Sequence, residues 1–314
     1  MRPVCFIVFL LSSLKLARAV RGLNEATSLV ARSEEQRMSN YSHIFQRRSD
    51  RVVGAPAAHA CLLQLRGGGI GIKPIVAAKG ITLLIGFQGV ASYLFPESML
   101  DSYQVPRTPS AKALHRLTGL SWLIFAIGSH LLVVEQQPIS KVVGVASVLY
   151  LLDGVRGVFL DDTAIFSPGR ESMLLILHSL VAYATLARRE SPLASLTTKV
   201  VPFGFLVAGL PLVVSPSSAC ASLWGISPPV TTAGDCLIVR LLGFAFAGLA
   251  AFVGSSFHGS ALQAVGWGHL ASGTAFCLTT LFDDDQLEKP KGPYYVWLTI
   301  YGVVLSALLP AESS

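Results

Sequence analysis

Residues 236–257 read CLIVRLLGFAFAGLAAFVGSSF and contain a single charged side chain, Arg240. An α-helix needs about 20 apolar residues to cross the hydrocarbon core of a bilayer, so this stretch is long enough to span a membrane. The whole chain is 52% hydrophobic and 13% charged, with a mean hydropathy of +0.58, whereas soluble domains carry about 25% charged residues. Because backbone groups left unpaired in hydrocarbon are costly, we expect an all-α, polytopic membrane protein.

Seven further apolar stretches bring the expected number of transmembrane helices to about eight. The fourth, fifth and eighth are short and need flanking residues, local thinning of the bilayer or burial between other helices to cross it. Pro202 and Pro211 make the fifth the least secure of the set. The predicted spans are residues 75–95, 114–134, 139–160, 172–187, 200–214, 236–257, 261–282 and 294–309.

The distribution of charge predicts the orientation of these spans. Eight crossings place both ends of the mature chain on one side, and Lys and Arg are retained on the cytosolic side of short-loop membrane proteins. We therefore expect both mature ends in the cytosol or in the stroma of an organelle. The net charge of +6 does not indicate a nucleic-acid partner, since much of it lies in the N-terminal region and no basic helix with interleaved aromatics follows. The basic residues on the retained side are Arg66, Lys73, Lys141, Arg188, Arg189 and Lys199.

Sequence features recur between the two halves of the apolar region. Pro96 and Pro216 end the first and fifth spans 120 positions apart, and two further sets of landmarks recur at 122 and 124. These intervals predict two tandem four-helix units, 73–190 and 191–314, in the same orientation about an axis along the membrane normal. Chance similarity between apolar segments is the alternative. The further landmarks are Val143-Gly144 with Val265-Gly266 and residues 159–162 with 281–284 at 122, and residues 116–119 with 240–243 at 124.

Small residues recur at every fourth position of the sixth and seventh spans. They are Gly243, Ala247 and Ala251 in the sixth, and Ala264, Gly268 and Ser272 in the seventh. Such stripes allow close approach of helix backbones in a membrane, so we expect them to face one another or another subunit.

The first unit resembles a known family over residues 95–119. Its landmarks are Phe95-Pro96-Glu97, Leu100-Asp101, Thr108-Pro109 and the run from Arg116 to Gly119. They are similar to the start of tumour-suppressor-inducible four-span membrane proteins and, more loosely, of small DoxX-like proteins. The resemblance implies a four-span unit and brings no catalytic motif with it.

The N-terminal region has the features of targeting sequences. Residues 1–19 combine an early arginine, a short apolar core and an Ala-Arg-Ala cleavage site, which predicts a signal peptide. Residues 20–72 are arginine-rich and without apolar periodicity, so we expect a disordered transit-like segment. Together they resemble the bipartite presequence of plastid proteins in algae with complex plastids. A plastid membrane is favoured, with the endoplasmic reticulum or another secretory membrane as the alternative, for which Asn40 is a glycosylation acceptor.

Asp153 and Arg156 are the candidate intramembrane polar site. They lie three positions apart in the third span, where they can pair on neighbouring faces of a helix. Charge within a membrane is costly and therefore indicates a substrate or ion site by default. A structural pair is the alternative, because the corresponding positions of the second half are Ala275 and Leu278.

Other chemically capable residues give weaker signals. Two imidazoles on facing helices can hold a haem, but the spacing predicts interfacial or helix-linking histidines, so no cofactor and no metal site is expected. Cys220 and Cys236 share one loop and are a candidate disulfide in an oxidising lumen, with two free thiols as the alternative. Asp161-Asp162 and Asp283-Asp284-Asp285 are expected to be solvated turns rather than cation sites. The histidines concerned are His115, His130, His178, His258 and His269.

The sequence contains no nucleophile elbow and no phosphate-binding loop, so no catalytic residue is predicted. The favoured function is a non-enzymatic membrane component for assembly or scaffolding, whose partners are the lipid bilayer and other membrane proteins. One alternative is a small-solute or ion transporter with a midplane site at Asp153 and Arg156. The other is a haem-binding membrane redox protein.

Overall fold

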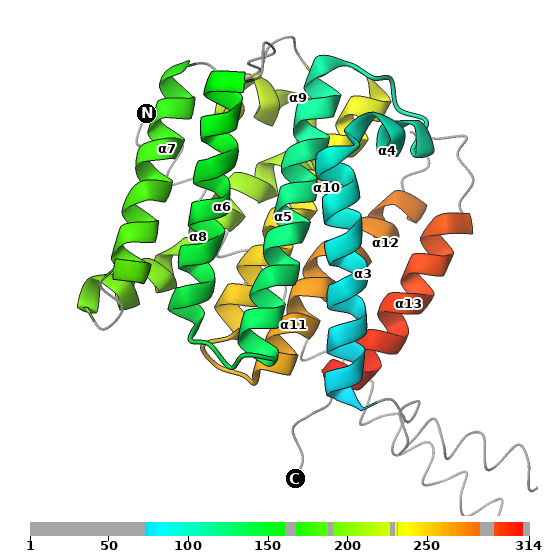
Figure 1. Cartoon of the computed structure of the whole chain (residues 1–314). Coiled ribbons are helices and arrows are strands. Elements are labelled where there is room, and N and C mark those ends of the chain that lie inside the picture. The colour runs from blue at the N-terminus through cyan, green and yellow to red at the C-terminus, as the bar shows by residue number, and fades with distance from the viewer. Residues whose placement is uncertain are drawn as a thin grey trace, which may run out of the picture. The chain divides into compact units, whose positions relative to one another are not determined.

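The computed structural model describes residues 73–160, 168–187, 191–226, 230, 232–282 and 292–309, and every regular element in these ranges is a helix. The predicted signal peptide and transit-like segment lie outside the described residues. The α-helices are α3 (Pro74–Leu94), α4 (Pro96–Ser102), α5 (Pro109–Val133), α6 (Ile139–Leu160), α7 (Pro168–Ala182), α8 (Pro192–Val214), α9 (Pro216–Ala219), α10 (Ala233–Ser255), α11 (Ala261–His269), α12 (Ala275–Phe282) and α13 (Gly292–Leu308) (Figure 1). Three π-helical turns are η2 (Tyr183–Ala187), η3 (Cys220–Trp224) and η4 (Leu270–Thr274).

Each of the eight apolar stretches is helical, which confirms the all-α class. Four helices, α3, α5, α8 and α10, are long and apolar enough to cross a membrane. Shorter apolar helices cover 171–187 and 294–308. The chain is therefore a helical membrane protein, while eight crossings remain a prediction. All described helices belong to one compact unit, 68–314, and its division at residue 190 also stays a prediction.

The fifth segment differs from the sequence prediction at its start. Helix α8 begins at Pro192 rather than at residue 200, and the Ser191 hydroxyl accepts a hydrogen bond from the Ala194 amide at 3.2 Å. A serine N-cap followed by proline starts a helix without any apolar signal, which is why hydropathy missed this turn. Pro202 and Pro211 lie within α8 without ending it. This segment is therefore not short.

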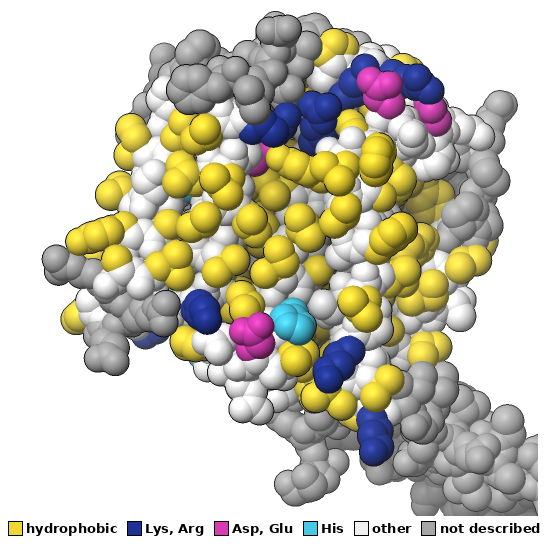
Figure 2. All heavy atoms as spheres, viewed as in Figure 1, with side chains coloured by type: hydrophobic (Ala, Val, Ile, Leu, Met, Phe, Trp, Pro, Cys, Tyr) yellow, Lys and Arg dark blue, Asp and Glu magenta, His cyan; other side chains and the backbone are white. Residues whose placement is uncertain are grey.

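Helix α10 is the centre of the bundle. In its most apolar window 78% of the residues are buried, against 17% in α8, and it packs against α5, α8, α11 and η4. The peripheral helices instead expose large apolar side chains: Leu83 and Phe87 of α3 are each 75% exposed. Figure 2 shows hydrophobic side chains over the middle of one face, with charged side chains gathered toward its two ends. Apolar surface in such a band is the pattern of a protein solvated by lipid.

Two helix crossings depend on pairs of glycines. Where α3 crosses α5, a Cβ built on Gly89 would lie 2.8 Å from the Gly119 carbonyl oxygen. Where α8 crosses α10, a Cβ built on Gly209 would lie 2.8 Å from the Gly243 carbonyl oxygen. In both crossings the backbones themselves are in contact, so a side chain at either glycine would force the helices apart.

The two predicted small-residue stripes do not face one another. Gly243 lies against α8, whereas Gly268 and Ser272 lie against Gly248 on another side of α10, where a Cβ on Gly248 would be 2.5 Å from Ser272 Cβ. Both stripes thus contact neighbours within the chain. Four-residue spacing identified them correctly as contact surfaces, but it does not define the partner helix.

Candidate functional site

A cavity of about 470 Å³ lies between α3, α4, α5, α10, η4, α12 and α13. Eight of its 19 lining residues are aromatic, a far larger fraction than the 9% of the whole chain. The walls therefore favour flat or unsaturated apolar groups. None of the 19 is charged. Sequence patterns did not predict this cavity, because its lining comes from seven helical elements that are spread along the chain.

Several uncharged polar side chains lie in the cavity wall. The Gln88 side-chain amide donates a long hydrogen bond of 3.4 Å to the Tyr103 hydroxyl, and Tyr103 packs edge-on against His115. Tyr301 is only 5% exposed, and its hydroxyl lies against Gly273 in η4, where any side chain would collide with it. Within the described ranges no residue forms a hydrogen bond with that hydroxyl. The hydroxyl is therefore available as a donor to a partner inside the cavity.

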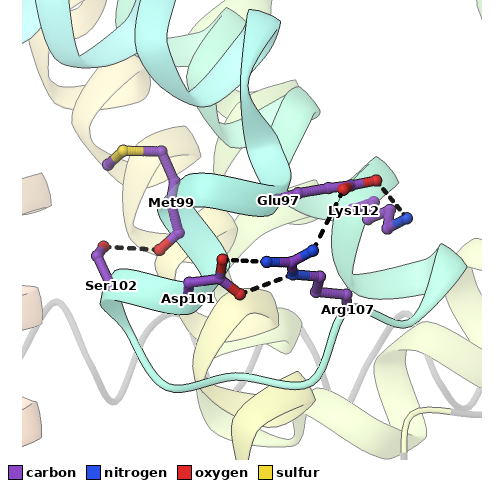
Figure 3. A network of polar contacts seen from close by, with 6 residues as sticks. All are labelled: Glu97, Met99, Asp101, Ser102, Arg107 and Lys112. Carbon is purple, nitrogen blue, oxygen red and sulfur yellow. Dashed lines mark hydrogen bonds and ion pairs between the residues drawn. The ribbon is translucent and has the colours of Figure 1, made fainter.

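A network of ion pairs fixes the α4 end of the cavity (Figure 3). Lys112 Nζ lies 2.5 Å from Glu97 Oε1, and Arg107 Nε donates to Asp101 Oδ1 at 2.7 Å, while a second nitrogen of Arg107 contacts the other oxygen of that carboxylate. Arg107 also reaches Glu97 Oε2 at 3.7 Å. The network, here called the α4 bracket, ties the helix to the start of α5. Four cavity residues, 99 and 102–104, are carried by this bracketed segment.

The α4 bracket also shifts the titration of its carboxylates. The hydrogen bond and positive charge of Lys112 lower the pKa of Glu97 below its ordinary 4.5. The hydrogen bond from Arg107 lowers the pKa of Asp101 below its ordinary 3.8. All four groups are exposed to solvent to a large extent, so the bracket orders a local segment rather than stabilising the whole fold.

The predicted intramembrane pair is formed, and a third residue joins it. Arg156 Nε donates to Asp153 Oδ1 at 3.1 Å and to the Tyr93 hydroxyl at 3.1 Å, while Tyr93 donates to Asp153 Oδ1 at 2.8 Å. The guanidinium also lies over the Tyr93 ring, 5.5 Å from its centroid. None of the three lines the 470 Å³ cavity. Sequence reasoning missed Tyr93, which comes from α3, because its contact with α6 depends on how these helices pack.

The histidines are dispersed through the helices. His178 stacks on Tyr150 at 5.0 Å between ring centroids, and His269 packs between Phe125 and Tyr301 at 4.7 and 5.7 Å. His115 is fully buried, and neither of its ring nitrogens has a hydrogen-bond partner among the described residues. In the part of the chain that the structure describes, no three His, Cys, Asp or Glu side chains form a group that could hold a metal ion. The acidic turns 161–162 and 283–285 lie outside that part.

Cys220 at the start of η3 and Cys236 near the start of α10 are both buried and not joined by a disulfide, and the Cys236 sulfur lies 3.4 Å from the Ser217 hydroxyl. Burial, together with the nearby Cys236 and Asp235, raises the pKa of the Cys220 thiol to about 12. A thiol in this state reacts slowly with oxidants and alkylating reagents at neutral pH. Their pairing in an oxidising lumen stays a prediction.

Asp235 joins the start of α5 to the start of α10, a role that sequence reasoning did not assign to it. Thr108, the N-cap of α5, donates to Asp235 Oδ1 at 3.1 Å, and Thr232, the N-cap of α10, donates to Oδ2 at 2.8 Å. The side chain is 5% exposed rather than solvated in an acidic loop. Its position three residues after a threonine N-cap was the available signal.

No protein-family model matches this chain, and no curated protein or solved structure shows significant similarity to it.

Proposed function

We propose that this chain is an eight-crossing membrane protein of two tandem four-helix units that serves as a non-enzymatic assembly or scaffold component. The tandem arrangement is supported by the glycine crossings. Gly89 and Gly209 are 120 positions apart, and their partners Gly119 and Gly243 are 124 apart. Each crossing thus repeats at the intervals that relate the other sequence landmarks.

Two further relationships support the duplication. Thr108 and Thr232 are both N-caps and lie 124 positions apart. A Cβ on Gly144 would lie 2.5 Å from Leu186 Cδ2, and a Cβ on Gly266 would lie 3.2 Å from Leu308 Cβ. Gly266 and Leu308 each lie 122 positions after Gly144 and Leu186. Contacts between helices therefore recur together with the residues that make them.

The observation that favours a scaffold over a transporter is the closed cluster of Tyr93, Asp153 and Arg156. A carboxylate in a transport site has to face a path for solute, whereas Asp153 is hydrogen-bonded to two protein side chains and lies outside the cavity. The charges are therefore used to join α3 to α6. Peripheral helices such as α8, with 17% of its apolar window buried, leave apolar faces for lipid or partner helices.

The discriminating experiment replaces the pair by the residues of the second half. The double variant Asp153→Ala/Arg156→Leu should insert normally and enter a detergent-solubilised complex of the same size as the natural chain, judged by native gel electrophoresis. Liposomes holding either protein should show only background flux of ions and small solutes. Flux through the natural chain that the double variant abolishes would instead establish the transporter.

The compartment is tested separately. We propose a plastid membrane from the presequence-like residues 1–72, and a fluorescent protein fused after Ser314 should co-localise with plastid pigments. Retention in the endoplasmic reticulum, with glycosylation at Asn40, would contradict it.

A further inference from the structure

At the position of the first unit that corresponds to the cavity, a large side chain fills the space. Ser272 lines the cavity, and the residue 122 positions before it is Tyr150. The Tyr150 ring stacks on His178 and packs against Phe246, with centroids 5.0 and 6.5 Å away, and its hydroxyl shares a 2.9 Å hydrogen bond with Ser121. This comparison rests on the proposed duplication, whereas the cavity and its lining do not.

The position of the cavity gives access to lipid. Leu84 and Phe87 line it from α3 and are also 39% and 75% exposed on the outer surface. Trp297 and Tyr301 line it from α13, which packs against α3. A hydrophobic molecule can therefore enter sideways from the bilayer, without crossing the polar end of the bundle. The volume of about 470 Å³ is within the range of roughly 300–1,000 Å³ that holds a drug-sized molecule.

The lining defines the chemistry of the occupant. The absence of Lys, Arg, Asp, Glu and His from the 19 lining residues disfavours phosphate, carboxylate and ammonium groups, because a charge would be buried without a partner. Aromatic walls favour flat rings or conjugated chains. The unpaired Tyr301 hydroxyl and the loosely bonded Gln88 amide, with a hydrogen bond of 3.4 Å, both offer donors to an oxygen.

We propose that this cavity is a binding site for a neutral lipid, with a flat ring system or an unsaturated isoprenoid body and a single hydroxyl or carbonyl oxygen. Tyr301 donates a hydrogen bond to that oxygen. The aromatic side chains of α3, α10, α12 and α13 pack on the apolar body. The α4 bracket holds the end of the site near Tyr103.

Two of the four tryptophans, Trp122 and Trp297, line the cavity and provide the readout. The purified full chain in mild detergent is titrated with dehydroergosterol, a sterol, and in a second arm with all-trans-retinol, an isoprenoid alcohol. Both probes accept energy from excited tryptophan, so bound probe emits when tryptophan is excited. Saturable transfer at about one probe per chain is expected for at least one arm, and the responding arm identifies the lipid type. Charged cis-parinaric acid should not compete.

Matched variants separate the cavity from the detergent-exposed surface. Ala91→Phe narrows the cavity and should abolish saturable transfer, whereas Val90→Phe, on the exposed side of α3, should leave it unchanged. Tyr301→Phe should weaken binding about tenfold, the effect of one lost hydrogen bond, while Tyr295→Phe, at a 58% exposed position of α13, should not.

Failure of both probes to bind saturably would overturn the proposal, as would unchanged binding by Ala91→Phe. If Ala91→Phe does not fold, the test is to identify by mass spectrometry the lipids that remain bound to the natural chain after extraction from its own membrane. A neutral lipid that retinol or dehydroergosterol displaces supports the site, and phospholipid alone contradicts it. These outcomes are independent of the scaffold proposal, which depends on complex size and flux.

Discussion

Gly89 and Gly119 lie in reciprocal backbone contact where α3 crosses α5. A Cβ on Gly119 would be 2.8 Å from the Gly89 carbonyl oxygen, and a Cβ on Gly89 would be 2.8 Å from that of Gly119. Neither obstacle is a flexible side chain that could move aside. The crossing therefore fixes the distance between α5 and α3, the helix that supplies Tyr93 to the cluster with Asp153 and Arg156.

Substituting Gly119 tests this contact. Gly119→Ala should lower the free energy of unfolding by about 1–3 kcal/mol, the range for overpacked sites, because the helices have to separate. Thermal unfolding of the purified protein in mild detergent measures the effect. Gly80→Ala is the control, since its Cβ would meet nothing within 4 Å. Equal melting temperatures for the two variants would show that the crossing is not tight.

The charged pair should behave as a unit. Arg156→Leu leaves the Asp153 carboxylate with the Tyr93 hydroxyl as its hydrogen-bond partner among the described residues, so we expect a loss of about 3 kcal/mol in stability. Adding Asp153→Ala should restore most of it, because no charge is then left. Melting temperatures of the single and double variants provide the comparison. A double variant less stable than the single one would mean that the pair has another role.

Asp235 should stabilise the fold through its two threonine donors. Asp235→Ala removes both hydrogen bonds and leaves the hydroxyls of Thr108 and Thr232 to find other partners, which should cost about 1–3 kcal/mol. Denaturation in detergent measures this change. Glu97→Ala, which removes an exposed carboxylate, should change global stability little. Comparable effects of the two substitutions would contradict a special role for Asp235.

The α4 bracket should open only in acid. Because the pKa values of Glu97 and Asp101 are lowered by folding, their contribution is complete above the ordinary values of 4.5 and 3.8 and is lost as the pH falls through the lower folded values. Hydrogen exchange of residues 96–108 should therefore be unchanged from pH 7 to pH 5 and faster, after correction for intrinsic rates, near pH 3. Arg107→Gln at neutral pH should reproduce the acid result. Loss of protection already at pH 5 to 6 would exclude the bracket as its cause.

Local sequence signals predicted much of this fold. Hydropathy located the eight long apolar segments that are helical, though not the short helices α4 and α9, and spacing brought Asp153 and Arg156 together. What it missed depends on contacts between distant segments. Tyr93 joins the pair only through the packing of α3 on α6, and the cavity is lined by residues from helices far apart in the chain. The π-helical turn η4 was likewise invisible, because its backbone pattern leaves no periodic signature.

We propose that eight helices cross the membrane as two four-helix units of the same orientation. Single cysteines are introduced into a chain whose native cysteines are replaced by serine, and sealed vesicles of one orientation are labelled with an impermeant maleimide. Eight crossings predict that positions 102, 162, 232 and 284 are labelled from one side, and positions 136, 189, 259 and 312 from the other. Labelling of two consecutive positions along the chain from the same side would contradict a topology of eight crossings.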